Sequence, residues 1–488
     1  MTARASAAGY NADGHPFAAD DLLAALGAEH AGRLRALDAP APAPSTSGSA
    51  QAVPDGAARA DYDVVLAGGG LSFLLAPLLA RRGRRVAVLD RAPVARAHRE
   101  WNASADELEA LVEVGLLRAD QLEALVVNRY AFGTCHWHGH PPTVVRGVLD
   151  CAVDAGGLLA HARRLAADAG VDCYDRAQVD GERHGADGVR LAVRQGGERF
   201  AVDARVLVDA RGAQSPHARA DLICPTVGGV LEDLRQGDGD GLWRPDVGEI
   251  LASTEGCEDG VQHLWEAFPG RPGQLTVYLF AYRPNGDVRP GALERLYGRF
   301  WATLGRYKRG VPKLVRPTYG LIPGWSRLTP AARSPHPRVL LVGDAAARHS
   351  PLTFCGFGAM LRSLPKAVAA VEQVFERPGA PPPLAVDDVP LHQATGALAH
   401  MMAHPPKEPA ALNDLLAAAF ATLESMGNDV YAGLLKDRLP AGDMVRFLWR
   451  TSRRHPAVWR QVRSGLGLGR ALAWSGRLGT RALLGDDG

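Results

Sequence analysis

The sequence lacks several patterns that would assign it to a special class. None of its six cysteines forms a C-x-x-C pair, and their spacings fit no metal framework: they are Cys135, Cys151, Cys173, Cys224, Cys257 and Cys355. Scattered cysteines are typical of a reducing compartment, so we expect a cytoplasmic protein. The start of the chain lacks the basic and then apolar pattern of a secretory signal. No uncharged apolar run reaches the roughly 18 residues of a membrane-spanning helix.

Net charge is also nearly absent, because 55 Lys and Arg residues face 53 Asp and Glu residues. A formal charge of +2, without a recognition motif, argues against nucleic acid as a partner. The balance hides a basic tail: residues 444–488 hold nine arginines and two acids, which gives +7 and leaves −5 for the rest. Aromatic residues stand between these arginines: Phe447, Trp449, Trp459 and Trp474.

Two interpretations of this tail remain open. A helical segment of this composition can lie on an anionic lipid surface, so peripheral membrane contact through residues 444–485 is one expectation. The other is a helical cap that packs its tryptophans inward and solvates its arginines.

The composition is that of an ordinary globular protein, with 47% apolar and 22% charged residues in 488. Residues 1–60 are predicted to form a short helix (19–37) and a flexible linker rich in Pro, Ala, Ser and Gly. A helical region with the basic tail is predicted for residues 388–488.

The glycine run Gly68-Gly69-Gly70 lies between a predicted buried strand (62–67) and a predicted helix (71–82). With a second strand at residues 85–90, this order predicts a βαβ unit that binds a dinucleotide. Gly68 allows a tight turn, and Gly70 allows the backbone to approach a pyrophosphate at the helix N-terminus.

Two further residues qualify this prediction. Asp90 ends the second strand, where a carboxylate can accept hydrogen bonds from an adenosine ribose. Phe73 occupies the position of the third glycine in G-x-G-x-x-G, so the helix must tilt away or the ring must point elsewhere. The alternative is a glycine-rich turn in another kind of α/β protein.

A second candidate site lies about 275 residues downstream. An apolar strand ends in Gly343-Asp344, and a loop through Pro351 and Gly356-Phe357-Gly358 leads into a predicted helix at 359–376. The aspartate can hold a ribityl hydroxyl, and the helix N-terminus can stabilise negative charge on a flavin or a pyrophosphate.

Between these sites the sequence predicts a helix (157–169), strands at 171–174, 189–193, 200–202 and 206–209, and then alternating segments in 213–335. The expected fold is therefore α/β: an FAD/NAD(P)-binding Rossmann-like fold with an inserted antiparallel substrate sheet and a C-terminal helical region. The predicted domains are a cofactor domain (61–212 and 336–378) and a substrate domain (213–335).

Three segments resemble the motifs of the glutathione-reductase-type FAD superfamily, in its hydroxylase-like branch: residues 66–90, VLVDARG (206–212) and LVGDAAARHSPLTFCGFG (341–358). Within that branch the chain is similar to lycopene cyclase-like flavoproteins, through REWN (99–102), WEAFP (265–269) and SPLTFCGFG (350–358). The resemblance covers about residues 61–376.

The resemblance implies FAD as the cofactor, with Asp209 and Gly212 as supports. It also leads us to expect that Arg99 reaches the FAD phosphates, although a surface role for Arg99 is equally open. Together with the residues named above, the expected cofactor site is Gly68, Gly69, Gly70, Asp90, Arg99, Asp209, Gly212, Gly343, Asp344, Pro351, Gly356, Phe357 and Gly358.

Glu266 is the candidate catalytic residue, because lycopene cyclases carry an acidic motif between the second and third FAD motifs. Protonating an alkene needs a carboxylic acid kept neutral in an apolar pocket, and Trp265 and Phe268 are the expected walls. The cyclases have paired acids, whereas here Ala267 follows Glu266. The alternative is a glutamate with a structural hydrogen bond.

The remaining cluster, His136, His138 and His140, would share one face of a strand, as metal ligands can. No acidic or cysteine partner at a useful spacing accompanies them, so no metal site is predicted.

The leading hypothesis is an FAD-dependent enzyme that acts on a small hydrophobic substrate of the isoprenoid or carotenoid type. One alternative is an FAD monooxygenase or a polyprenyl reductase that uses NAD(P)H as reductant. Another is a flavin-binding assembly protein without catalysis.

Overall fold

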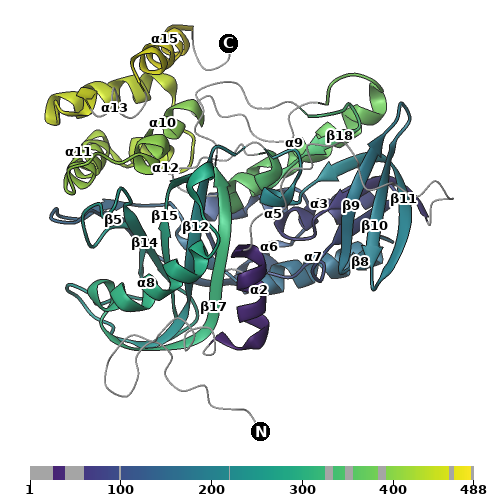
Figure 1. The fold of residues 1–488 in the computed structure, drawn as a ribbon, viewed down its shortest axis with the longest axis horizontal. Coiled ribbons are helices and arrows are strands. Elements are labelled where there is room, and N and C mark those ends of the chain that lie inside the picture. Colours follow the sequence, from purple (N-terminus) through teal and green to yellow (C-terminus); the bar gives the residue numbers. More distant parts are fainter. Residues whose placement is uncertain are drawn as a thin grey trace.

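Two large β-sheets lie side by side in the computed structural model (Figure 1). It describes residues 26–38, 60–97, 100–218, 220–324, 334–346, 356–382, 392–460 and 467–484. The first sheet has the order β8-β2-β1-β11-β10-β9, with β18 paired to β11. Its strands are β1 (Ala60–Ala67), β2 (Val86–Asp90), β8 (Asp172–Asp175), β9 (Ala177–His184), β10 (Val189–Gln195), β11 (Glu198–Asp209) and β18 (Val339–Leu341).

The parallel part of this sheet follows from its apolar runs. Strand β1 pairs in parallel with β2 and β11, β8 extends β2, and β18 extends β11. Both faces of such a sheet are covered at its centre, so β2 and β18 are largely apolar, whereas β8 at the edge is polar and partly exposed. One face packs on α3 (Leu75–Ala80), α7 (Ala155–Asp168) and α9 (Gly356–Glu376), and the other on side chains of β9 and β10.

Strand β11 corrects one prediction. Residues 200–202 and 206–209 were expected to be separate strands, but they form one strand of 12 residues. Its first half pairs with β10 and its last residues pair with β18, so the strand passes from an antiparallel to a parallel neighbour without a break.

The second sheet is mostly antiparallel, with the order β16-β12-β15-β14-β13-β5-β6 and β17 paired to β12. Its strands are β5 (Phe132–His136), β6 (Thr143–Val145), β12 (Leu222–Leu234), β13 (Val247–Ala252), β14 (His263–Pro269), β15 (Leu275–Ala281), β16 (Arg283–Pro284) and β17 (Gly310–Gly324). The predicted substrate segment 213–335 therefore leaves out β5 and β6, which join this sheet from the preceding part of the chain. Strand β5 pairs in parallel with β13 and antiparallel with β6, and neither pairing carried a signal in local sequence.

Helices cover both faces of the second sheet. Helix α8 (Ala292–Tyr307) packs on one face, and α2 (Ala28–Asp38) lies beside it. The carboxylate of Asp38 accepts the backbone N–H groups of Leu293 (2.9 Å) and Glu294 (3.0 Å), which caps the start of α8. Helix α2 begins after Gly27 (φ +78°), which interrupts the helix predicted at 19–37, whereas residues 19–25 of that helix and 39–59 of the linker lie outside the described residues.

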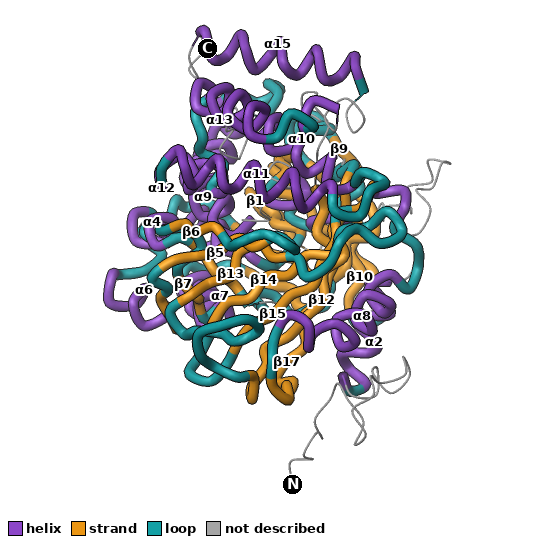
Figure 2. Tube along the Cα trace, turned by 90° about the vertical axis from the view of Figure 1, so that its left-hand side faces the viewer, coloured by secondary structure: helices purple, strands orange, loops and turns teal. Residues whose placement is uncertain are grey.

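The C-terminal helices stack above the other face, with α15 outermost (Figure 2). They are α10 (His392–Ala403), α11 (Ala411–Met426), α12 (Asn428–Leu435), α13 (Ala441–Arg454) and α15 (Leu468–Leu484). They confirm the C-terminal helical region of the predicted fold. No helix in the described part of the chain is both long and apolar enough to cross a membrane.

A small third sheet joins the two large ones. It consists of β3 (Trp101–Ala103), β7 (Cys151–Val153) and β4 (Val126–Arg129), and short helices α4 (Ala105–Leu108), α5 (Ala110–Glu113) and α6 (Ala119–Leu125) surround it.

The histidine cluster is not on a strand face as expected. Strand β5 ends at His136, and the chain then turns through Gly139 at φ +80°. His140 Nε2 lies 2.9 Å from Asp414 Oδ1 on α11, and the ring of Trp137 packs 5.0 Å from that of Phe420. This segment therefore connects the second sheet to the C-terminal helices.

Candidate functional site

The carboxyl ends of four parallel strands bring the predicted cofactor segments together. Gly68 follows β1, Asp90 ends β2, Asp209 ends β11, and Gly343 lies two residues beyond β18. Backbone bonds connect the ends: Gly68 N donates to Leu89 O (2.8 Å), and Ala210 N donates to Ala67 O (2.8 Å). In open α/β sheets ligands bind at this edge.

Gly68 must be a glycine because the backbone of Ala210 lies too close to it for a side chain. Gly68 has φ +111°, and a Cβ on it would stand 2.3 Å from the carbonyl oxygen of Ala210. Gly69 N donates to Asp90 Oδ2 (2.6 Å), while the other carboxylate oxygen accepts Ala92 N (2.7 Å). Asp90, predicted as a ribose ligand, thus also holds the glycine turn in place.

Gly70, unlike Gly68 and Gly69, has room for a side chain among the described residues. No atom of the described chain lies within 4 Å of a Cβ added there, so the backbone faces open space at the start of the helix. That space is what a pyrophosphate on a helix N-terminus needs.

Phe73, which stands where the third glycine of the motif would be, lies in the first turn of the helix. The helix begins as a 3-10 turn, η1 (Leu71–Leu74), before α3 starts at Leu75. The ring of Phe73 is fully buried in the core shared with α7 and α9. The chain therefore accommodates Phe73 inside the core of the cofactor domain.

The second and third motifs meet beside this turn. Gly212 (φ +61°) would place a Cβ 3.6 Å from the Cβ of Asp344, and Gly343 (φ +56°) would place one 3.3 Å from Ser72 Oγ. Ser72, in the first helical turn, was not singled out in the sequence. Its position two residues after the glycine run was the signal available.

Asp209 is fully buried and holds the turn that carries Gly212. It accepts Arg211 N (3.1 Å), the Arg211 guanidinium (2.9 Å to Oδ2) and Ser215 Oγ (2.6 Å). Its carboxylate is occupied by its own loop, which suits the predicted supporting role.

The start of α9 is shaped by a buried ion pair. A Cβ on Gly358 would stand 2.2 Å from the Glu107 carboxylate, which pairs with Arg362 on the next turn of α9. The ring of Phe357 packs on Trp101 (4.8 Å between centroids). Of the other predicted loop residues, Gly356 begins α9, and Pro351 and Arg99 lie outside the described residues.

Glu266 lies on β14 in a partly buried position that faces the third sheet. Burial raises the pKa of its carboxyl to about 7, although the Asn102 amide, which donates to Oε1 at 3.1 Å, lowers it in part. Asn102 adjoins Trp101, so the REWN and WEAFP segments meet in space and reach the start of α9 through Phe357. This pairing was not predicted.

One expected wall of the Glu266 pocket is wrong. Neighbouring residues of a strand point to opposite faces, so Trp265 packs against Tyr307 (4.9 Å) and Phe300 on α8. Phe268 shares the face of Glu266. Tyr278 on β15 is the direct cross-strand partner of Glu266.

The comparisons with known proteins agree with this architecture. No protein-family model and no curated protein matches the sequence. Among solved structures, the chain is similar to a geranylgeranyl bacteriochlorophyll reductase-like protein from Thermoplasma acidophilum. The TM-score is 0.52 at 16% identity, over 83% of this chain and 99% of that one.

Two further structures share the fold. A flavoprotein/dehydrogenase from Cytophaga hutchinsonii has a TM-score of 0.52 at 14% identity, over 86% of this chain and 100% of that one. The halogenase PltM, solved with phloroglucinol and FAD, has a TM-score of 0.50 at 14% identity, over 87% of this chain and 91% of that one. At these identities the likeness shows the predicted FAD/NAD(P)-binding Rossmann-like fold.

Proposed function

We propose that this chain binds FAD along the carboxyl edge of its first sheet and acts as a flavin-dependent enzyme. The observation that carries the proposal is the convergence of Gly68–Gly70, Asp90, Gly212 and Asp344 at the ends of four parallel strands. The open space at Gly70 fits a pyrophosphate, and a side chain there would fill it.

Different residues of this edge would bind different parts of the cofactor. Asp90 would hold the adenosine ribose, the N–H groups after Gly70 the pyrophosphate, and Asp344 the ribityl chain. Bound FAD would supply hydride or electron transfer, which side chains cannot provide. The α9 N-terminus would favour negative charge on the nearby flavin ring.

Glu266 is the proposed proton donor to the substrate. A carboxyl with a pKa of about 7 is substantially protonated at neutral pH and can give up its proton. Asn102 orients Oε1, and Phe268 and Tyr278 line the same face of the sheet. An apolar substrate suits these walls, and the isoprenoid class named for the Thermoplasma relative is the class we propose.

The second candidate is a monooxygenase or reductase that takes electrons from NAD(P)H. A single glutamate followed by Ala267 favours it over cyclisation, since cyclases carry paired acids at this motif. An anhydrotetracycline hydroxylase from Streptomyces rimosus, with a TM-score of 0.50 at 18% identity, has the same fold. The third candidate is a flavin-binding assembly protein.

One spectroscopic experiment distinguishes these candidates. The purified protein is reconstituted with FAD, and its visible spectrum is followed under nitrogen while NADPH and then air are added. Bleaching by NADPH with O₂ uptake on aeration supports the monooxygenase, and bleaching without uptake supports the reductase. A spectrum that NADPH does not change leaves acid catalysis by Glu266 and the assembly protein, and a loss of turnover in Glu266→Gln then distinguishes the first from the second. A protein that takes up no FAD would refute all three.

We also propose that the C-terminal helices contact an anionic lipid surface. Phe447 and Trp474 are buried, as a cap requires, but Trp449 and Trp459 are each 55% exposed. Val445 and Arg453 flank Trp449 one helical turn away on either side, and Arg453 lies over its ring at 4.9 Å. Exposed tryptophan beside arginine fits the lipid interface.

A further inference from the structure

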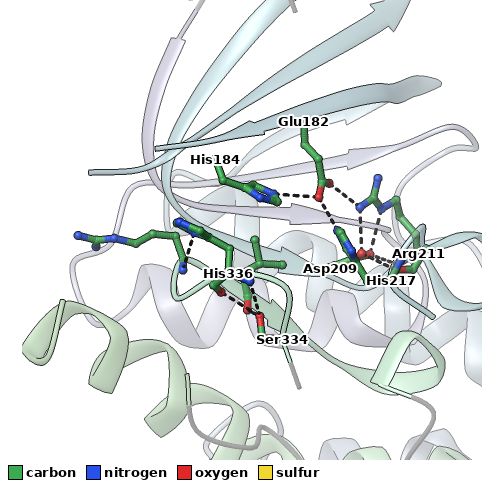
Figure 3. A network of polar contacts seen from close by, with 10 residues as sticks. Glu182, His184, Asp209, Arg211, His217, Ser334 and His336 are labelled. Carbon is green, nitrogen blue, oxygen red and sulfur yellow. Dashed lines mark hydrogen bonds and ion pairs between the residues drawn. The ribbon is translucent and has the colours of Figure 1, made fainter. Parts of the chain in front are cut away.

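A group of histidine and carboxylate side chains lies outside the residues assigned above. Glu182 and His184 come from the end of β9, and His217 comes from the turn after η2 (Gly212–Gln214) (Figure 3). Their three ligand atoms all lie within 4.8 Å of one another. We propose that Glu182, His184 and His217 bind a divalent transition-metal ion, and that Zn²⁺ fits best.

The distances suit a tetrahedral ion. His184 Nε2 lies 3.0 Å from Glu182 Oε1, and His217 Nε2 approaches the same oxygen. In a tetrahedral zinc site with bonds of about 2.0–2.2 Å, ligand atoms stand roughly 3.3 Å apart. Small rotations of the side chains are therefore enough to admit an ion, and a water molecule would complete the coordination.

The charges also suit a cation. Arg211 pairs with both Glu182 and Asp209 at 2.9 Å. Counted at their formal charges, these two carboxylates and one guanidinium carry one net negative charge.

The surroundings orient the ligands without blocking them. Arg211 binds the other carboxylate oxygen, Glu182 Oε2 (2.9 Å), which leaves Oε1 directed at the histidines. The ring of His336 stacks on His184 at 5.0 Å and fixes its plane. The side chains of Glu182, His184 and His217 retain 11–24% exposure, so an ion can enter from solvent.

The metal would fasten two segments that are distant in sequence. It would connect the end of β9 to the turn that Asp209 holds through Ser215, and this turn carries Gly212 beside Asp344. The ion would thus stabilise one wall of the candidate cofactor site, although the proposal itself rests on these ligands alone.

Calorimetric titration of Zn²⁺ into the full-length, chelator-treated protein tests the proposal. We expect one tight ion per chain, and an affinity loss of about tenfold or more in H184A and H217A. The control is H404A, which removes the exposed ring of His404 that stacks on His400 of α10 and should leave the tight ion in place.

Two further variants separate a metal site from a plain ion-pair network. In H217Q the amide can still donate to Glu182 but ligates zinc poorly, whereas in H217C a thiolate restores a ligand. A metal site predicts that Zn²⁺ raises the unfolding temperature of the wild type and H217C but not of H217Q. Absence of tight binding in the wild type, equal binding by H217Q, or loss in H404A alone would overturn the proposal.

Discussion

At the scale of single residues, the chemistry depends on where the fold places Glu266. The carboxyl shares its sheet face with Phe268 and Tyr278, and Asn102 is its hydrogen-bond donor. A glutamate on the exposed face of a strand would have an ordinary pKa and would be fully ionised at neutral pH. Burial raises the pKa of the Glu266 carboxyl, so that part of it stays protonated at neutral pH.

Replacing this residue gives the first prediction. Glu266→Gln keeps the shape of the side chain but removes its proton, so turnover should fall about 100-fold or more. In the wild type the pH profile should show a group that ionises near pH 7, and the variant should lose it. Once a substrate has been identified, the assay is its steady-state turnover measured as a function of pH. An unchanged rate and profile would remove Glu266 from the mechanism.

The same group makes stability depend on pH, and this gives the second prediction. Its pKa is higher in the folded state, about 7, than the ordinary value of 4.5. The wild type should therefore lose stability relative to Glu266→Gln as pH rises from about 4.5 to 7, and lose no more above that. The loss is on the order of 3 kcal/mol, measured by urea unfolding at several pH values. Parallel pH curves for the two proteins would contradict the burial of this carboxyl.

At the scale of elements, the start of α9 depends on a glycine for an unexpected reason. Gly358 was predicted to face the cofactor, and the structure places the Glu107 carboxylate where its Cβ would be. Glu107 and Arg362 are both buried, so separating them leaves an uncompensated charge.

The third prediction follows from that contact. Gly358→Ala should displace Glu107 and destabilise the protein by about 3 kcal/mol or more, as seen in thermal or urea unfolding. Gly356→Ala is the matched control, because no described atom lies within 4 Å of its added Cβ. Equal stability of the two variants would show that Glu107 does not pack against this turn.

The elements differ in how far the sequence could predict them. Strands β1, β2 and β18 and the glycine turns after β1 and β18 could be predicted from the sequence. Buried parallel strands and phosphate-binding turns have local signatures. Strand β9 was missed because it is largely polar, and the place of β5 and β6 in the second sheet was not predicted because pairing across the chain has no local signal. The contact of Asn102 with Glu266, 164 residues apart, is likewise a product of tertiary structure.

At the scale of the whole molecule, charge and exposed aromatic area coincide at one end. The basic tail forms the outermost helices of the C-terminal stack (Figure 2). We predict that the protein co-sediments with vesicles containing anionic lipid and releases them as salt rises.

Paired variants test this prediction. Replacing both Trp449 and Trp459 by Ala should weaken vesicle binding several-fold without changing the unfolding temperature, since both rings are largely exposed. Val311→Ala, which alters an exposed apolar residue on β17, is the control. Equal binding by the tryptophan variant and the wild type would dismiss the lipid surface.

The central claim concerns the cofactor, and a substitution at Gly70 tests it most directly. A methyl group at Gly70 meets no described atom, yet it would occupy the space proposed for the pyrophosphate. Gly270 has equally open surroundings among the described residues and lies in the turn between β14 and β15, so Gly270→Ala is the matched control.

The most direct measurement is FAD binding by these three proteins, followed through quenching of flavin fluorescence. We predict that the wild type and Gly270→Ala bind one FAD per chain, and that Gly70→Ala binds about tenfold more weakly or worse while unfolding at the same temperature. Failure of the wild type to bind FAD, or equal affinity of Gly70→Ala, would contradict the account.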